Sequence, residues 1–202
     1  SVLEEYGKDG YASFYNKIFR GVLLILLVLL VIVTFISKWL VSFFTSSDYL
    51  DAWIYIPVLT LGIFFSCVSG LAGSTFSAVR KSRYFFYSSV YGGLSSIVFN
   101  FLLIPLWGIW GAVLSVVLSF MVMSVSRVAY SWTYVKLTHI PRLLLMLLLT
   151  CIYIVSVCLT GSANSLVAGF ITIGLLLLLN CDLLHLLKRK IIKRYIAKWK
   201  RR

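Results

Sequence analysis

Outside the C-terminal tail, the densest group of residues that could bind a ligand is Arg80, Lys81 and Arg83, which separates two long apolar stretches. Arginine binds phosphate through paired hydrogen bonds, so this group could hold an anionic lipid or a diphosphate. Basic residues beside an apolar stretch also serve simply to orient a membrane helix. Arg127, a more isolated basic residue, has the same two interpretations, and the residues alone leave both open.

Small and hydroxyl residues recur every three or four positions in the middle of the chain. Five serines are candidates for lining a polar cavity: Ser66, Ser69, Ser74, Ser96 and Ser115. Small residues at this spacing also let two helices pack closely. Asn100 is the most polar side chain near these serines, and its amide either bridges two helices or faces a cavity. The pattern therefore predicts close helix packing, a polar passage, or both.

The apolar stretches lack the residue patterns on which catalysis and metal binding depend. His139 and His185 are far apart and have no partner at metal-ligand spacing. Four cysteines lie within apolar stretches without a CxxC pattern, which is typical of small packing residues: Cys67, Cys151, Cys158 and Cys181. We therefore expect no enzyme activity, no catalytic residue, no metal and no cofactor.

The composition is that of a membrane protein. Hydrophobic residues make up 61% and charged residues 12% of the 202 positions, whereas a soluble domain has ~45–50% apolar and ~25% charged residues. A transmembrane helix needs ~20 apolar residues, so the chain has enough for about six. Long unbroken apolar runs exclude a membrane β-barrel, whose strands alternate. The net charge of +13 lies between and after these runs, a distribution that argues against nucleic-acid binding.

Charge-poor stretches, each about twice the length of one span, divide the chain into three membrane hairpins. Polar, proline and glycine residues mark the turns near 45–48, 105–108 and 161–165. The predicted fold class is all-α, a polytopic membrane protein with six transmembrane helices: 19–44, 52–79, 84–104, 108–131, 142–160 and 165–187. The chain divides into a loop (1–18), four helices (19–135), two additional helices (136–187) and a basic tail (188–202).

The basic residues predict which helix ends share one side of the membrane. Eighteen of the nineteen fall before the first span, between the hairpins or in the tail, and only Lys38 falls toward the other side. By the positive-inside rule, the loop 1–18 and the C-terminal tail are cytoplasmic. Apolar residues in the tail follow helical spacing, so it is either an amphipathic helix on anionic headgroups or a solvated orientation signal.

Three stretches carry a family resemblance: 48–57 (DYLDAWIYIP), 73–82 (GSTFSAVRKS) and 100–112 (NFLLIPLWGIWGA). They resemble the polysaccharide-transport branch of the multidrug/oligosaccharidyl-lipid/polysaccharide exporter superfamily, the O-antigen and capsule flippases. The segments 4–8 (EEYGK) and 14–20 (FYNKIFR) look like the cytoplasmic loop before the ninth helix of that family. The resemblance covers residues 1–135, whereas residues 140–202 match only in hydropathy.

The resemblance implies a transporter with two lobes around a central cavity that opens alternately to either side. The six predicted spans would be its ninth to fourteenth helices, so the remainder of the same protein is expected to precede Ser1. The implied substrate is an undecaprenyl-diphosphate-linked oligosaccharide repeat unit, moved across the bacterial inner membrane. Bilayer lipids, a polysaccharide polymerase and a chain-length regulator are the implied partners.

Other functions remain as alternatives. A multidrug or metabolite antiporter of the same superfamily would bind its coupling cation through acidic residues within the spans, and this chain has none there. A membrane-embedded polymerase or acyltransferase needs catalytic residues in its loops, and the predicted outer loops hold only Asp48 and Asp51. A non-catalytic anchor or assembly subunit is a further alternative.

Overall fold

The computed structural model describes residues 11–181 except 46, 136–137, 139 and 161–164. The described residues form six α-helices, one 3-10 helix and no strand, which confirms the predicted all-α class for this part of the chain. The elements are α2 (Tyr11–Phe44), η1 (Ser47–Ile54), α3 (Ile56–Val79), α4 (Arg83–Trp107), α5 (Ile109–Trp132), α6 (Ile140–Thr160) and α7 (Ser165–Leu179).

Five helical segments, of 19 to 34 residues, are long and apolar enough to cross a membrane. They comprise α2, most of η1 together with α3 as far as Ser77, α4, α5 and nearly all of α6. Helix α7 is apolar but has 15 residues, and positions 182–187 of the sixth predicted span lie outside the described residues. The structure is thus that of a multi-pass membrane protein with five candidate spans, and the sixth span remains a prediction.

Helix α2 begins earlier than the first predicted span. It starts at Tyr11 rather than at 19, because Tyr11, Tyr15, Phe19 and Leu23 form a four-residue repeat whose side chains are all buried. The segment expected to be a loop is therefore helical from Tyr11 onward, and residues 1–10 lie outside the described part.

The hairpin of α4 and α5 turns at the last residue of the predicted turn 105–108, and α4 is longer than the predicted span. Helix α4 continues through Pro105 to Trp107, whereas the predicted span ended at 104. Pro105 lacks the backbone N–H that would bond to the carbonyl four residues earlier, yet the helix continues for two residues beyond it. The chain reverses at Gly108 instead, whose φ of 56° and ψ of −124° are accessible to glycine without strain. Gly108 therefore determines where this hairpin turns.

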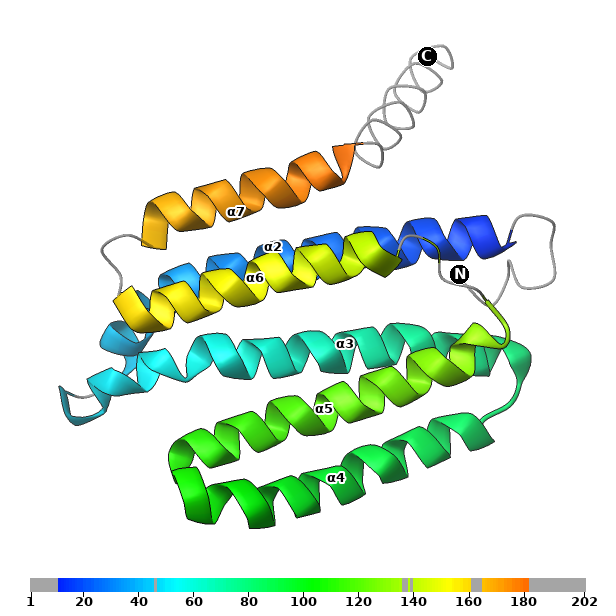
Figure 1. Ribbon diagram of the computed structural model, residues 1–202, viewed down its shortest axis with the longest axis horizontal. Coiled ribbons are helices and arrows are strands. Elements are labelled where there is room, and N and C mark those ends of the chain that lie inside the picture. Colours follow the sequence, from blue (N-terminus) through cyan, green and yellow to red (C-terminus); the bar gives the residue numbers. More distant parts are fainter. Residues whose placement is uncertain (1–10, 46, 136–137, 139, 161–164, 182–202) are drawn as a thin grey trace, which may run out of the picture.

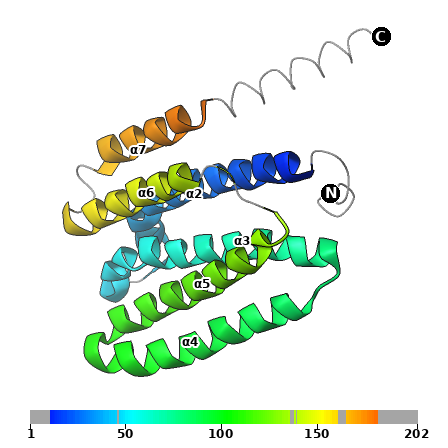
Figure 2. The ribbon, with the colours of Figure 1, turned by 45° about the vertical axis from the view of Figure 1, so that its right-hand side comes forward.

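The helices form two groups of three that meet along α2 and α3 (Figure 1). In one group α3 and α4 both pack against α5, and in the other α2, α6 and α7 pack against one another. Helices α3 and α4 make few direct contacts, although only Arg80, Lys81 and Ser82 join them. Figure 2 shows the same order, from α4 through α5 and α3 to α2, α6 and α7.

The two groups are held together differently. Around α2 the contacts come from large apolar side chains, among which Leu27, Leu30 and Met146 are almost fully buried. Between α4 and α5 the backbones approach so closely that a Cβ at Gly111 would overlap the carbonyl group of Leu103. Because a bilayer supplies no hydrophobic force between helices, close packing of this kind is what holds them.

Described basic residues gather at one end of the helices, where α2, α4 and α6 begin and α3 and α5 end (Figure 1). Within the described chain only Lys38 lies toward the other end, together with Asp48 and Asp51 of η1. The remaining seven are Lys17, Arg20, Arg80, Lys81, Arg83, Arg127 and Arg142. The hairpin topology thus produces the predicted segregation of charge, and we call this the basic end.

Helix α3 is capped at its C-terminal end by Arg80, which has a left-handed backbone with φ 55° and ψ 33°. Such helix ends usually carry glycine, because a side chain costs about 1 kcal/mol in this region. We expect Arg80→Gly to raise the free energy of unfolding by about 1 kcal/mol, measured by equilibrium unfolding in detergent. Arg80→Ala keeps the Cβ and should give no gain. An equal gain from both variants would contradict the backbone explanation.

Candidate functional site

Arg127 of α5 is a buried arginine that joins three helices near the basic end, and only 5% of its surface is exposed. Its Nε donates to Ser88 Oγ at 3.0 Å and its Nη2 to Ser89 Oγ at 2.8 Å, both on α4. Its Nη1 donates to the carbonyl oxygen of Ser69 on α3 at 3.4 Å. A guanidinium has five N–H groups, so two have no acceptor among the described residues.

Phe85 covers this guanidinium on its outer side. The Arg127 Cζ lies 3.9 Å from the centre of the Phe85 ring, which is a cation–π contact. The ring itself is 44% exposed, so it separates the charge from the molecular surface. A Cβ at Gly73 would lie 2.9 Å from the ring. Glycine at position 73 therefore leaves the space in which Phe85 lies over Arg127.

The charge of Arg127 has no carboxylate partner within the described part of the chain. The acidic residues at described positions, Asp48 and Asp51, belong to η1 at the opposite end. Ser88 and Ser89 each donate their own hydroxyl hydrogen to the Phe85 carbonyl, at 2.9 Å and 3.0 Å, and so face Arg127 as acceptors. Buried charges in membrane proteins are commonly paired or functional. The described residues therefore leave the charge of Arg127 without a counter-ion.

The predicted basic group on the α3–α4 link lies in a different environment. Arg80, Lys81 and Arg83 are all exposed. Lys81 Nζ lies 5.3 Å from the centre of the Tyr134 ring. The Arg83 guanidinium lies 5.1 Å from the centre of the Tyr84 ring and donates to its hydroxyl at 3.3 Å. The candidate basic residues are thus divided between an exposed link and one buried guanidinium.

Asn100 bridges α4 and α5, which is one of its two predicted roles. Its Nδ2 donates to the Ser96 carbonyl at 2.8 Å and to Ser96 Oγ at 3.3 Å. Its Oδ1 accepts a hydrogen bond of 2.6 Å from Ser115 Oγ. Ser115 is fully buried and Asn100 half-buried. This polar bridge lies between the same two helices as the contacts of Arg127 with α4, nearer the turn at Gly108.

The three candidate serines of α3 do not act together. Ser69 is fully buried, its carbonyl accepts from Arg127, and its own hydroxyl has no partner among the described residues. Ser74 donates to the carbonyl of Leu71 at 2.7 Å, and Ser66 is half-buried. Of the three, Ser69 is therefore the one that contacts Arg127.

The sequence interpretation placed Arg127 beside a loop and missed that it points inward. A usable signal was present, because Gly111, Ser115 and Ser119 repeat every four residues and the same spacing, interrupted by Met123, reaches Arg127 and Ser131. Residues four apart share one face of a helix. All five are buried in α5, so extending the small-residue repeat would have placed the arginine in the helix interface.

A second arginine links helices in the other group, and no sequence pattern indicated it. Arg20 of α2 donates from Nε to Asn180 Oδ1 at 2.6 Å and from Nη2 to the Leu179 carbonyl at 3.4 Å. Asn180 is fully buried, and its Nδ2 lies 3.5 Å from the Met146 sulfur on α6. Arg127 and Arg20, one in each group of three helices, thus both donate to neutral groups on neighbouring elements.

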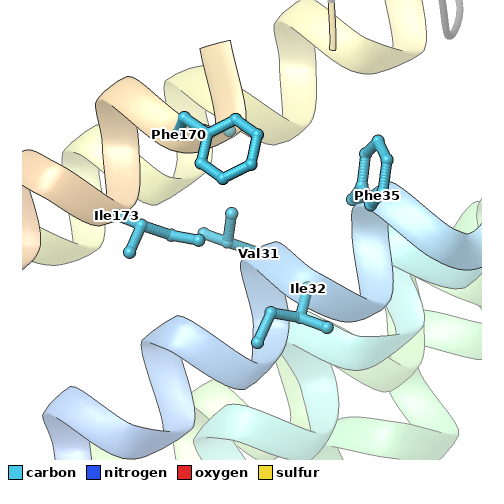
Figure 3. Close-up of a pocket in the computed structure, with 6 residues that line it drawn as sticks. Val31, Ile32, Phe35, Phe170 and Ile173 are labelled. Atoms are coloured by element: carbon cyan, nitrogen blue, oxygen red, sulfur yellow. The ribbon is translucent and has the colours of Figure 1, made fainter. Parts of the chain in front are cut away.

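A cavity of about 150 Å³ lies between α2 and α7, in the group that does not contain Arg127. Its lining is entirely apolar and consists of Val31, Ile32, Phe35, Gly169, Phe170 and Ile173 (Figure 3). A surface of this kind can hold hydrocarbon but offers no group for polar recognition or catalysis.

The described residues include no group of three or more His, Cys, Asp or Glu side chains placed to hold a metal ion. The two histidines and the basic tail 188–202 lie outside the described residues, and the cysteines are free. No protein-family model, curated protein or solved structure matches this chain. The functional assignment therefore depends on the chemistry of the site and on the motifs in the sequence.

Proposed function

We propose that this chain is part of a flippase that moves undecaprenyl-diphosphate-linked oligosaccharide repeat units across the bacterial inner membrane for surface polysaccharide synthesis. The observation that carries the proposal is the buried guanidinium of Arg127, held by serine oxygens and without a carboxylate among the described residues. A diphosphate would supply the missing negative charge and accept the two remaining N–H groups. The motifs at 48–57, 73–82 and 100–112 support this class of substrate.

The α3–α4–α5 group supplies the polar groups that such a substrate needs. A sugar headgroup loses its hydrogen bonds to water when it enters hydrocarbon, so transport requires polar groups that replace them. In the proposed cycle the diphosphate binds Arg127, and sugar hydroxyls exchange hydrogen bonds with Asn100, Ser96 and Ser115 farther along the α4–α5 interface. Rocking of two lobes against each other then exposes the path to the opposite side. The basic end faces the cytoplasm in this arrangement.

Deleting the gene in its own host tests this proposal whichever sugar the repeat unit contains. We expect loss of surface polysaccharide and accumulation of lipid-linked repeat units on the cytoplasmic face of the inner membrane, both reversed when the gene is returned on a plasmid. A defect in an enzyme that builds the repeat unit would instead deplete these intermediates. Normal surface polysaccharide, or loss of polysaccharide without accumulated intermediates, would refute the flippase assignment.

A further inference from the structure

We propose that the α3–α4 link is a binding site for the phosphate diester of an anionic bilayer lipid, phosphatidylglycerol, in the leaflet at the basic end. The site consists of Arg80, Lys81 and Arg83 with the rings of Tyr84 and Tyr134. This inference goes beyond the proposed transport function and does not depend on it, because the lipid is a component of the membrane rather than the molecule carried.

The charge of the link is the first argument. Three cations lie within four consecutive residues, and all three side chains are exposed. The described carboxylates, Asp48 and Asp51, lie at the other end of the helices. A single Lys or Arg near an anionic membrane surface contributes about 1 kcal/mol, roughly fivefold in affinity. Three exposed cations within four residues therefore make a strong local attraction for a lipid phosphate.

The tyrosines are the second argument, because they hold two of these cations in defined positions. Lys81 lies against Tyr134, and Arg83 lies against Tyr84 and donates to its hydroxyl. The two rings are neighbours, with centroids 6.3 Å apart. Tyrosine is enriched at the level of lipid headgroups. Lys81 and Arg83 are thus pre-positioned at the depth where a lipid phosphate lies, which lowers the entropic cost of binding.

The backbone adds to the positive electrostatic potential at the link. Arg80 occupies a left-handed position where glycine would be more stable, so the chain carries a third cation there at a cost in stability. Helix α4 begins at Arg83 itself, with no acidic residue in its first turn and no side-chain hydrogen bond from its N-cap Ser82. The positive end of the helix dipole therefore adds to the charge of the three side chains.

The exposed position of the link favours a lipid of the bilayer over the carried molecule. Phe85 covers Arg127 and separates it from the surface, whereas the link lies open at the helix ends. A lipid diffusing within its leaflet reaches such a position without entering the helix interface. Soluble phosphate shares the chemistry of the headgroup, and the experiment distinguishes the two.

Native mass spectrometry of the purified full chain in neutral detergent tests the site. With equal amounts of phosphatidylglycerol and phosphatidylcholine added, we expect the wild type to retain phosphatidylglycerol preferentially. Arg83→Gln should weaken that retention about tenfold, because it removes both the charge and the paired hydrogen bonds. Arg83→Lys keeps the charge alone and should fall between. The matched control is Lys17→Gln, because Lys17 is an exposed cation at the same end. This substitution should weaken phosphatidylglycerol retention by no more than about fivefold.

If Arg83→Gln and Lys17→Gln weaken phosphatidylglycerol retention equally, the basic end attracts the lipid only diffusely, and the proposal is overturned. Equal retention of the two lipids by the wild type would also overturn it. Displacement of phosphatidylglycerol by inorganic diphosphate at lower concentration than the lipid itself would assign the link to soluble phosphate instead. Circular dichroism checks the fold of each variant, and Lys81→Gln replaces Arg83→Gln if the latter does not fold.

Discussion

Replacing Arg127 with methionine is expected to abolish surface polysaccharide export while leaving the protein at least as stable as the wild type. Loss of a hydrogen-bonded charge at a phosphate site costs about 1.5–3 kcal/mol, roughly 10- to 150-fold in binding. Stability should be unchanged or rise by up to about 2 kcal/mol, because a buried charge is replaced by an apolar side chain of similar shape. Ser88 and Ser89 keep their own hydrogen bonds to the Phe85 carbonyl, so no donor is stranded.

Two measurements on each variant distinguish a role of Arg127 in substrate binding from a structural role. Export is measured as surface polysaccharide in the deletion host that carries the variant gene, and stability as equilibrium unfolding in detergent. Arg127→Lys, which keeps the charge but not the planar guanidinium, should retain part of the export. If Arg127→Met unfolds more readily than the wild type, the arginine is a structural link between α3, α4 and α5. Full export by that variant would remove Arg127 from the proposed mechanism.

Substituting Gly111 with alanine is expected to lower the free energy of unfolding by about 3 kcal/mol, since overpacking against a rigid neighbour has few ways to relax. The added Cβ would overlap the carbonyl of Leu103 in the facing helix. This group is backbone and cannot rotate away as a side chain can. Helices α4 and α5 would have to separate near the turn at Gly108, which also disturbs the bridge between Asn100 and Ser115.

Gly93 provides the matched control for this substitution because it lies in α4 and a Cβ there meets no atom within 4 Å. Gly93→Ala should be neutral or stabilising by up to about 1 kcal/mol, the usual gain from alanine in a helix. Both variants are compared by equilibrium unfolding in the same detergent. Similar stabilities for Gly111→Ala and Gly93→Ala would show that α4 and α5 do not approach as closely as described.

Much of the fold was predictable because membrane helices have strong local signals. Long apolar stretches interrupted by basic residues predicted the spans, and the hairpin turns placed the basic residues at one end. Boundaries were less predictable. The helix signal of Tyr11 and Tyr15 was hidden by neighbouring charges, and Pro105 suggested a break that the structure places at Gly108. Such boundaries depend on what packs against the helix end, which apolar content does not show.

Some residues of the candidate site were predictable, but their arrangement was not. Asn100, Ser115 and Arg127 were identified from their polarity within apolar surroundings. Which hydroxyls accept from Arg127 depends on contacts across 38 and 39 residues of chain. Ser88 and Ser89 were not among the expected residues, because serines in an apolar helix serve packing and recognition equally well.

The sequence by itself determined that this is an all-helical, multi-pass membrane protein whose basic residues gather at one end, because hydropathy and charge act through the local chain. Only the tertiary structure decided that Arg127 faces inward beneath Phe85, whereas Arg80, Lys81 and Arg83 remain exposed. The physical reason is that the direction of a side chain depends on which helices pack together. That choice depends on close contacts such as those of Gly73 with Phe85 and Arg127, which lie on other helices.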